Sequence, residues 1–560
     1  MDDRDTESLH RMHDALTERG FERLWGSERI VYRGLLDPTG LKVPIRIDVS
    51  DTDFVRPPPI FVEDSYHVTG RRLPHLLGES RSFCYYASGA VVLDRYNPGG
   101  TMLQCLQQAD SVIRKAVRGQ SDTDFADEFH NYWANSFLFV DLPPDFTGKA
   151  KVRYLDIDRR EERSAVLCLD DSWLVDVHRS NGNRLPDGDD CVVVSTDQAL
   201  SLNPDDEWPP TNLLKINRWL QWVDPKLVGL LERSFGSGNS LTRWVAIRAA
   251  NGTYVYSATL PAVLQKEEFR KSRQSNLPVV LSRLSGKVDV KRNSGVPADT
   301  DYIFTRNMGN MINLAGKRIL LIGVGTIGGF LAQQLAQSGA GSGGGELTLL
   351  DTDVLRTANL GRHLLGIPYI DRNKAEACAE FLKQQLPMLD VRFRVQDALD
   401  VLVGEGLPYD LIVDATGEEA LSLAINERAI RSKGSWPPIL FGYLIGNGAM
   451  AQALFTGDKD CACLKCLKPK LSGEPRFRSL RPEVEVVKIA NMQCADPLHI
   501  PYPVTRSVMA AALICEMALA WAAGNIGHRL RSHLFDQARA YTVKDGNPSP
   551  SRDCPACQPT

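Results

Sequence analysis

A glycine-rich turn between an apolar strand-like run and a helical run most constrains the fold of this chain. Gly323, Gly325 and Gly328 form a G-x-G-x-x-G motif directly after the apolar run Ile-Leu-Leu-Ile. Such glycines allow a tight turn and a close backbone approach to phosphate, and the amino end of the following helix attracts the anion. A second apolar run, 346–350, leads to Asp351, which is placed to bind ribose hydroxyls. By itself, the motif fits an NAD-dependent dehydrogenase equally well.

Polar residues downstream of Asp351 favour a triphosphate over a dinucleotide. Asn359, Arg362 and Lys374 follow it along the chain. A triphosphate needs such cations, whereas a dinucleotide is held largely by backbone amides. Asp414 ends a later apolar strand and is a candidate ligand for Mg²⁺ beside the phosphates. The alternative is that Arg362 and Lys374 are solvated side chains and that Asp414 caps a helix.

The chain is expected to be an α/β protein of several domains, because 560 residues exceed what one hydrophobic core accommodates. Residues 298–560 alternate strands with helices, which predicts a doubly wound, Rossmann-like parallel sheet. Residues 1–150 combine strand-like runs with a helical run and predict an α+β domain. Residues 151–297 carry no chemical motif and are assigned to a mixed linker or scaffold domain. Its expected elements are strands at 165–177 and 244–247 and a helix through 213–231.

Twelve cysteines follow a charged amino terminus without an apolar signal segment, so metal ligation or nucleophilic chemistry is expected rather than a disulfide framework. Two C-x-x-C pairs, Cys463 with Cys466 and Cys554 with Cys557, have the spacing of one tetrahedral Zn²⁺ site. Cys461 is a near neighbour that could replace one ligand. A redox role is less favoured because neither pair is expected to open a helix after a strand.

Charge and hydropathy narrow the classes of partner. The formal net charge is −4 without a block of like charge, which argues against direct nucleic-acid binding and against a polybasic membrane surface. The apolar run 508–524 is shorter than a membrane span and carries Glu516, so a buried helix is predicted there. We therefore expect a cytoplasmic protein.

Cys494 is a candidate nucleophile because it lies in a polar loop, whereas Cys378 and Cys515 lie in helical runs. A passive loop thiol is the alternative. Cys84, in the first domain, could by itself be a structural cysteine.

The C-terminal motifs carry a family resemblance. In order, Gly-x-Gly-x-x-Gly, Asp-x-Asp-x-Val, Asn-Leu-x-Arg, a lysine and Val-Asp-Ala-Thr resemble the ubiquitin-activating and ThiF/MoeB adenylating fold over about 305–557. The resemblance implies that Asp351 binds ribose and Asp414 binds magnesium, while Arg362 and Lys374 bind the phosphates of ATP. It also implies a Cys₄ zinc. Arg306 matches an arginine that reaches the ATP of the partner subunit, which implies a homodimer.

The N-terminal region, over about 20–132, resembles ubiquitin-conjugating enzymes. It has a Pro-Pro-Pro strand, Pro74-His75, Cys84 in the nucleophile position, and Tyr96-Asn97-Pro98 before a helix. Leu76 follows His75 where those enzymes carry asparagine, so the oxyanion must be stabilised by another group.

The order of the two domains resembles the fused conjugation enzymes of bacterial CBASS antiphage operons. This resemblance implies that a protein carboxyl terminus is adenylated with ATP, captured on Cys494 as a thioester, passed to Cys84 and delivered to an amine. The activated protein would be a cGAS-like nucleotidyltransferase. The alternatives are a bacterial ubiquitin-like modifier pathway, a sulfur-carrier adenylyltransferase and an NAD-dependent oxidoreductase.

Overall fold

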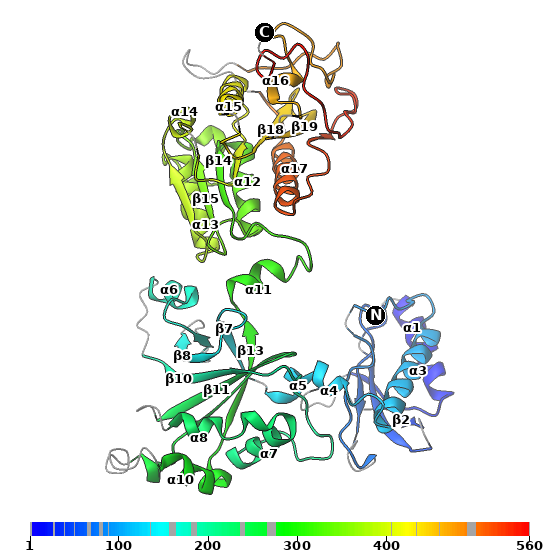
Figure 1. The fold of residues 1–560 in the computed structure, drawn as a ribbon. Coiled ribbons are helices and arrows are strands. Elements are labelled where there is room, and N and C mark those ends of the chain that lie inside the picture. The colour runs from blue at the N-terminus through cyan, green and yellow to red at the C-terminus, as the bar shows by residue number, and fades with distance from the viewer. Residues whose placement is uncertain are drawn as a thin grey trace. The chain divides into compact units, whose positions relative to one another are not determined.

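The computed structural model describes two compact units, Met1–Ala298 and Asp299–Thr560, and each is described by itself (Figure 1). The described residues are all those outside 1–2, 26–28, 38–39, 50, 64–68, 78–81, 88, 135, 156–163, 181–186, 236–240, 266–275, 405, 433, 458–459, 490–499 and 559–560.

The first unit opens with an antiparallel sheet in the order β1-β2-β3-β4-β6-β5. Alternate residues of β3, namely Val43, Ile45 and Ile47, are fully buried in one core with the inner faces of two helices. Asn97 begins the second helix by accepting the amide of Gly100, and proline at the first helical position suits that start. The predicted α+β domain is confirmed. Its elements are α1 (Asp3–Thr17), β1 (Glu22–Leu24), β2 (Ile30–Leu36), β3 (Val43–Val49), β4 (Ile60–Val62), β5 (Leu76–Leu77), β6 (Ser82–Phe83) and α3 (Pro98–Val117).

The rest of the first unit is a closed barrel in the order β10-β11-β12-β13-β7-β9-β8. Strands β7, β8, β10, β11 and β13 are labelled in Figure 1. Its strands are β7 (Phe137–Asp141), β8 (Gly148–Leu155), β9 (Ser164–Cys168), β10 (Asp189–Ser195), β11 (Thr242–Ala249), β12 (Gly252–Thr259) and β13 (Lys291–Pro297). The accompanying helices are α4 (Asp124–Asp127), α5 (Phe129–Trp133), α6 (Trp173–Ser180), α7 (Leu213–Val223), α8 (Leu230–Phe235) and α10 (Leu277–Leu284).

Three details of the barrel differ from the sequence-based expectation. The boundary predicted at residue 150 falls inside β8, because β7 and β8 pair with barrel strands. The strand predicted at 165–177 ends at Cys168, and the second part of that segment belongs to helix α6. The helix predicted through 213–231 stops at Val223, because Pro225 cannot continue an α-helix.

The second unit contains the predicted doubly wound sheet, in the order β16-β15-β14-β17-β18-β19-β20. The strands from β16 to β18 are parallel, while β19 and β20 extend the edge antiparallel. Ile319 and Leu321 of β14 face a core with α12 and α17, whereas Leu320 and Ile322 face a core with α15. Both faces are therefore covered by helices, as in a Rossmann-like fold.

The elements of this unit are α11 (Thr300–Thr305), β14 (Arg318–Ile322), α12 (Thr326–Gln337), β15 (Glu346–Leu350), α13 (Lys374–Gln385), β16 (Val391–Arg394), α14 (Ala398–Val401), β17 (Leu411–Asp414), α15 (Glu419–Arg431), β18 (Ile439–Ile445), β19 (Met450–Thr456), α16 (Leu464–Leu467), α17 (Val504–Ala522) and β20 (Leu530–Leu534).

Helix α17 is the one helix of the described chain long and apolar enough to cross a membrane by length and composition. Its residues Ala511, Ile514 and Met517 are buried in the core that also contains α12 and the sheet. The position of α17 accords with the buried helix expected at 508–524.

Candidate functional site

The glycine motif forms a tight loop at the carboxyl end of β14. Gly323 has φ +84°, and a Cβ on Gly328 would lie 1.7 Å from the carbonyl oxygen of Gly323. Only glycine fits these two positions. Gly325 caps helix α12, and nothing lies within 4 Å of where its Cβ would be. The loop is thus closed against the sheet and open in front of the helix, whose amino end suits a phosphate.

Asp351, one residue beyond β15, is held against this loop. One carboxylate oxygen accepts the amide of Val324 at 2.7 Å, and the other accepts the amide of Asp353 at 2.7 Å. Burial raises the pKa of Asp351, and these hydrogen bonds oppose that rise. The structure therefore brings the candidate ribose ligand to the glycine motif.

A buried histidine that sequence reasoning missed supports the same loop. The amide of Leu365 donates to Nδ1 of His363 at 3.0 Å, so the proton lies on Nε2, which is 2.8 Å from the carbonyl oxygen of Val324. Burial lowers the pKa of His363, and the amide hydrogen bond from Leu365 requires an unprotonated Nδ1. The available signal was its position directly after the Asn-Leu-x-Arg motif.

The residues expected at the phosphates differ in their burial and in their hydrogen-bond partners. Nζ of Lys374, at the start of α13, donates at 2.8 Å to a carboxylate oxygen of Asp353, and its side chain is 9% exposed. Lys374 is therefore not a solvated lysine. The side-chain oxygen of Asn359 accepts the amide of Arg356 at 2.9 Å and closes a local turn. Arg362 is half-buried next to His363.

Asp414 ends β17 beside β14 and is 2% exposed. One carboxylate oxygen accepts the amide and the hydroxyl of Thr416 at 3.0 and 2.7 Å, and the other accepts the hydroxyl of Ser422 at 2.6 Å. Burial raises its pKa. Helix α15 is capped at Glu418 without a side-chain hydrogen bond, so Asp414 does not act as that cap. The second carboxylate oxygen of Asp414 accepts the hydrogen bond from Ser422 and keeps a further acceptor site.

Arg306 lies at the end of helix α11, where its side chain is exposed and its Nη1 donates to the side-chain oxygen of Asn307 at 3.2 Å. Its side chain is therefore accessible from solvent at the start of the second unit.

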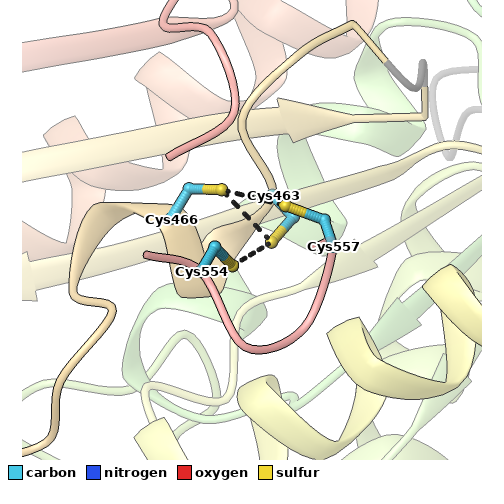
Figure 2. Close-up of side chains that lie close together, drawn as sticks. All are labelled: Cys463, Cys466, Cys554 and Cys557. Carbon is cyan, nitrogen blue, oxygen red and sulfur yellow. Dashed lines mark hydrogen bonds between the residues drawn. The ribbon is translucent and has the colours of Figure 1, made fainter. Parts of the chain in front are cut away.

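The two C-x-x-C pairs converge on one point, as Figure 2 shows. The sulfurs of Cys463, Cys466, Cys554 and Cys557 all lie within 4.8 Å of one another. The separations are 3.7 Å from Cys463 to Cys466 and to Cys554, and 3.3 Å from Cys466 to Cys557. Thiolates about 2.3 Å from a tetrahedral zinc lie about 3.8 Å apart, so the four residues fit such a site.

Two details of this cluster sharpen the sequence-based interpretation. Cys461 does not belong to the group of four. Cys463 directly precedes the four-residue helix α16, so the first pair does open a short helix, although the preceding strand β19 already ends at Thr456. The redox interpretation stays the weaker one, because four thiols share the site rather than two.

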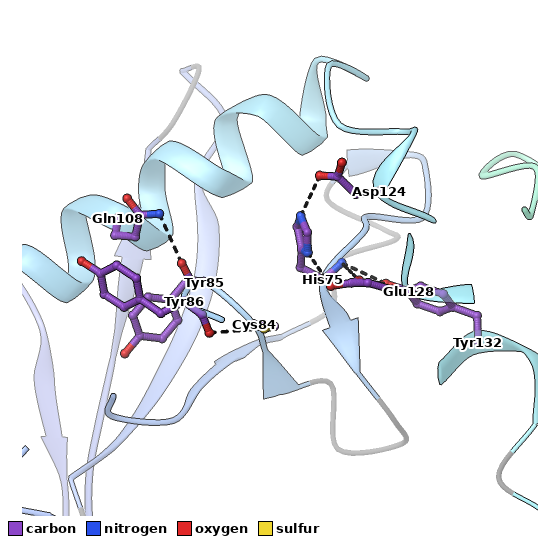
Figure 3. Close-up of polar contacts among 8 residues, drawn as sticks. All are labelled: His75, Cys84, Tyr85, Tyr86, Gln108, Asp124, Glu128 and Tyr132. Atoms are coloured by element: carbon purple, nitrogen blue, oxygen red, sulfur yellow. Dashed lines mark hydrogen bonds and ion pairs between the residues drawn. The ribbon is translucent and has the colours of Figure 1, made fainter. Parts of the chain in front are cut away.

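Cys84 directly follows β6 in the first unit (Figure 3). Its amide donates at 2.8 Å to the carbonyl oxygen of His75, and its sulfur is 3.5 Å from the carbonyl oxygen of Tyr86. The thiol is half-buried. Burial raises the pKa of Cys84, and the negative charge of Glu128 raises it further.

His75 lies between Asp124 of α4 and Glu128, which joins α4 to α5. Nδ1 lies 2.8 Å from a carboxylate oxygen of Glu128, and Nε2 lies 3.0 Å from Asp124 (Figure 3). Its amide donates to the hydroxyl of Tyr132 at 2.9 Å, and its φ is +67°. The hydrogen bond to Glu128 is the main cause that raises the pKa of His75. The sequence offered no signal for these partners, which lie about fifty residues away.

Cys494, the other candidate nucleophile, lies outside the described residues. Cys378 and Cys515 are buried, in accord with their expected place in helices.

Comparisons with known proteins match both halves of the chain. Residues 305–541 match the ThiF family, and residues 9–137 match Prokaryotic E2 family B. A Pseudomonas aeruginosa protein, ATP-dependent ubiquitin transferase-like protein Cap2, is 31% identical over 97% of this chain and 98% of its own length. The Vibrio cholerae protein of the same name is 27% identical over 84% of each chain. The molybdopterin-synthase adenylyltransferase of Escherichia coli is 30% identical over 29% of this chain and 62% of its own.

A ThiF-type adenylating domain and a conjugating-enzyme domain in one chain define an enzyme of the ubiquitin-activating and conjugating class. The match to the ThiF family supports ATP rather than a dinucleotide as the ligand of the glycine motif. The chain belongs to the Cap2 family of ATP-dependent ubiquitin transferase-like proteins. The resemblance drawn from the sequence motifs is thereby confirmed.

Proposed function

We propose that this enzyme activates the carboxyl terminus of a protein and transfers it to an amine through two thioesters. A carboxylate oxygen attacks the α-phosphorus of ATP and releases pyrophosphate. The thiolate of Cys494 then attacks the acyl carbon and releases AMP, and the thiolate of Cys84 takes over the acyl group, which frees Cys494. Finally, an amine nitrogen attacks the carbonyl and loses a proton, and Cys84 leaves as a thiolate.

The observation that carries this proposal is the half-buried thiol of Cys84, which lies beside His75, a histidine hydrogen-bonded to Glu128. The same chain also contains the glycine loop. In the second unit, Gly323, Gly325 and Gly328 would admit the phosphates, and Asp351 would accept from ribose. The half-buried position of Cys84 supports its role as the second carrier, because a thiol sealed in the core could not meet another protein.

The residues for phosphate binding are proposed as a second set. Lys374 and Arg362 would pair with the phosphates. Asn359 would stabilise the turn that precedes Arg362. Lys374 is already desolvated and needs only to exchange Asp353 for a phosphate oxygen. Asp414 would bind Mg²⁺, which neutralises phosphate charge when it is bound.

A structural Zn²⁺ is proposed for the four-cysteine cluster. Its thiolates come from segments 91 residues apart, so a metal would join the carboxyl end of the chain to α16. This role needs no open coordination position, since all four ligands are cysteines.

The proposed partners rest on the resemblance drawn from the sequence. The activated protein would be a cGAS-like nucleotidyltransferase, in an antiphage role in the cytoplasm. Arg306 would reach the ATP of the partner subunit in a homodimer, and its exposure supports that assignment. A ubiquitin-like modifier is the other candidate for the activated protein.

The test is to trap the thioesters. The full chain is mixed with ATP, Mg²⁺ and a nucleotidyltransferase with a free carboxyl terminus, and adducts are separated with and without thiol reductant. Cys84→Ala should abolish the final conjugate and leave an adduct on Cys494, whereas Cys461→Ala should behave as the wild type. An unchanged conjugate yield from Cys84→Ala would overturn the proposal.

The remaining alternatives give different results. A sulfur-carrier adenylyltransferase would form a thiocarboxylate independently of Cys84. An NAD-dependent oxidoreductase would show no ATP–pyrophosphate exchange with a carboxyl-terminal peptide. In our proposal, this exchange occurs and Asp414→Ala abolishes it.

A further inference from the structure

A pocket on the barrel of the first unit contains none of the residues proposed for nucleotide binding or thioester chemistry. Its volume is about 280 Å³, which is more than one phosphate group needs. Strands β8, β10 and β11 contribute to its lining, and β10 lies between the other two. Its lining residues are Lys149, Ala150, Lys151, Cys168, Leu169, Asp170, Asp190, Cys191, Val192, Ser234 and Arg243.

Three charged residues stand side by side on the wall of this pocket. The strand register places Asp190 of β10 opposite Lys151 of β8 and opposite Arg243 of β11. Lys151 donates to one carboxylate oxygen of Asp190 at 2.8 Å, and Nη1 of Arg243 donates to the other. The single carboxylate of Asp190 therefore pairs with two cations, and these three side chains together carry a net positive charge.

Arg243 has unused hydrogen-bonding capacity although it is buried. Its side chain is 3% exposed, and its Nε and Nη2 are buried with no hydrogen-bond partner in the described chain. Buried N–H groups are almost always paired, because an unpaired one loses its bonds to water without compensation. These two N–H groups share one edge of the guanidinium, the edge that binds an oxyanion with two parallel hydrogen bonds. Because both atoms are buried, a ligand in the pocket reaches them only when the Arg243 side chain turns toward it.

The remaining charges of the pocket do not satisfy that edge. Asp170 is 92% exposed and pairs with Arg153, which is not a lining residue. Lys149 is exposed at the pocket and pairs with no described carboxylate. The lining thus holds three cations against two carboxylates, and each carboxylate is already paired with a cation.

We propose that this pocket binds a phosphate-class oxyanion through the Nε and Nη2 edge of Arg243, with Lys149 as a second cation. A phosphate offers several acceptor oxygens and more than one negative charge, which suits a guanidinium edge beside an extra ammonium group. The volume leaves room for a phosphate that belongs to a larger molecule. The site would give the barrel a ligand-binding role independent of the thioester chemistry.

The experiment is isothermal titration of the full-length protein with inorganic phosphate at constant ionic strength. Arg243→Lys keeps the charge and removes the two-donor edge, while Lys149→Glu changes only an exposed side chain. Lys287→Glu, an exposed lysine of the same barrel domain that does not line the pocket, is the matched control. Lys374→Ala reports on phosphate that binds at the glycine loop instead.

We expect Arg243→Lys and Lys149→Glu each to weaken phosphate binding at the pocket at least tenfold, and Lys287→Glu to change it less than twofold. Lys374→Ala should remove only the binding at the glycine loop, so the pocket variants are also measured in the Lys374→Ala background. Circular dichroism checks that each variant folds. Parallel titrations of Lys374→Ala with pyrophosphate and with AMP then compare the affinity for an inorganic phosphate anion with that for a phosphate attached to a nucleoside. Absence of saturable binding to the wild type would overturn the proposal. So would binding that Lys374→Ala removes and Lys149→Glu leaves intact.

Discussion

The amide of Cys84 donates a 2.8 Å hydrogen bond to the carbonyl oxygen of His75, so the position of the thiol depends on the histidine that precedes β5. His75 is in turn held by Asp124 of α4 and by Glu128, which lies between α4 and α5. The end of β6 that leads to Cys84 is therefore fixed by side chains from a distant part of the sequence.

Replacing His75 by alanine should loosen this end of the sheet. Glu128 and Asp124 would lose their shared donor, and alanine adopts a φ of +67° only with strain. We expect hydrogen exchange at the Cys84 amide to accelerate about tenfold or more, equivalent to about 1–3 kcal/mol of local stability. His130→Ala, an exposed histidine on α5, serves as the control and should leave exchange unchanged. Equal exchange in both variants would contradict this account.

The charge of His75 should make the stability of this region depend on pH. Its raised pKa means that the folded chain binds the proton more tightly than the unfolded one. The resulting stabilisation is complete below the unfolded pKa of about 6.5 and is lost as the pH rises through the folded pKa. Histidine exchange measured by mass spectrometry should place the pKa of His75 above 6.5. Glu128→Gln should lower it, and a pKa at or below 6.5 in the wild type would refute the prediction.

Glu128 should also slow the chemistry of the Cys84 thiol. Burial is the main cause of the raised pKa of Cys84, and the charge of Glu128 adds to it. Glu128→Gln removes the charge with little change of shape, so more thiolate forms at neutral pH. We expect alkylation of Cys84 by iodoacetamide at pH 7.5 to accelerate about twofold to fivefold. Asp127→Asn changes an exposed acid at the end of α4, next to Glu128. It should leave the rate unaltered, and an equal acceleration there would point to a general charge effect.

The glycine loop provides a matched pair of substitutions. A Cβ at position 328 would lie 1.7 Å from the carbonyl oxygen of Gly323, so Gly328→Ala must displace the loop. We expect it to destabilise the second unit by about 1–3 kcal/mol or more and to abolish ATP binding. Gly325→Ala meets nothing within 4 Å and should fold normally. Thermal unfolding and fluorescent-nucleotide binding measure both effects, and normal ATP binding by Gly328→Ala would show that the loop is not the site.

The four-cysteine cluster should hold one zinc ion per chain. Elemental analysis of the purified protein should find it, and Cys463→Ser or Cys554→Ser should remove it, because a tetrahedral site tolerates loss of a thiolate poorly. Cys461→Ser is the control, since Cys461 is outside the group of four. Loss of zinc in the control alone would mean that the ligands are misassigned.

Local pattern was enough to predict much of the second unit. The apolar runs before Gly323 and Asp351 are buried parallel strands, and a glycine turn between strand and helix has few other solutions. The pairing of two C-x-x-C motifs was likewise visible from spacing. These features depend on neighbouring residues, which the sequence displays directly.

Contacts between distant segments were decided by the tertiary structure alone. The assignment of β7 and β8 to the barrel depends on pairing with β13 and β10, and an isolated strand pattern does not state its partner. His75 meets Glu128 across 53 positions, and Arg243 lies beside Asp190 only because β10 and β11 pair in parallel. The sequence by itself therefore determined the two catalytic domain types and their candidate nucleophiles. The packing of the first sheet and the closure of the barrel determined which charged side chains surround Cys84 and which line the pocket. A buried charge is stable only beside a partner, and that partner comes from another strand or helix.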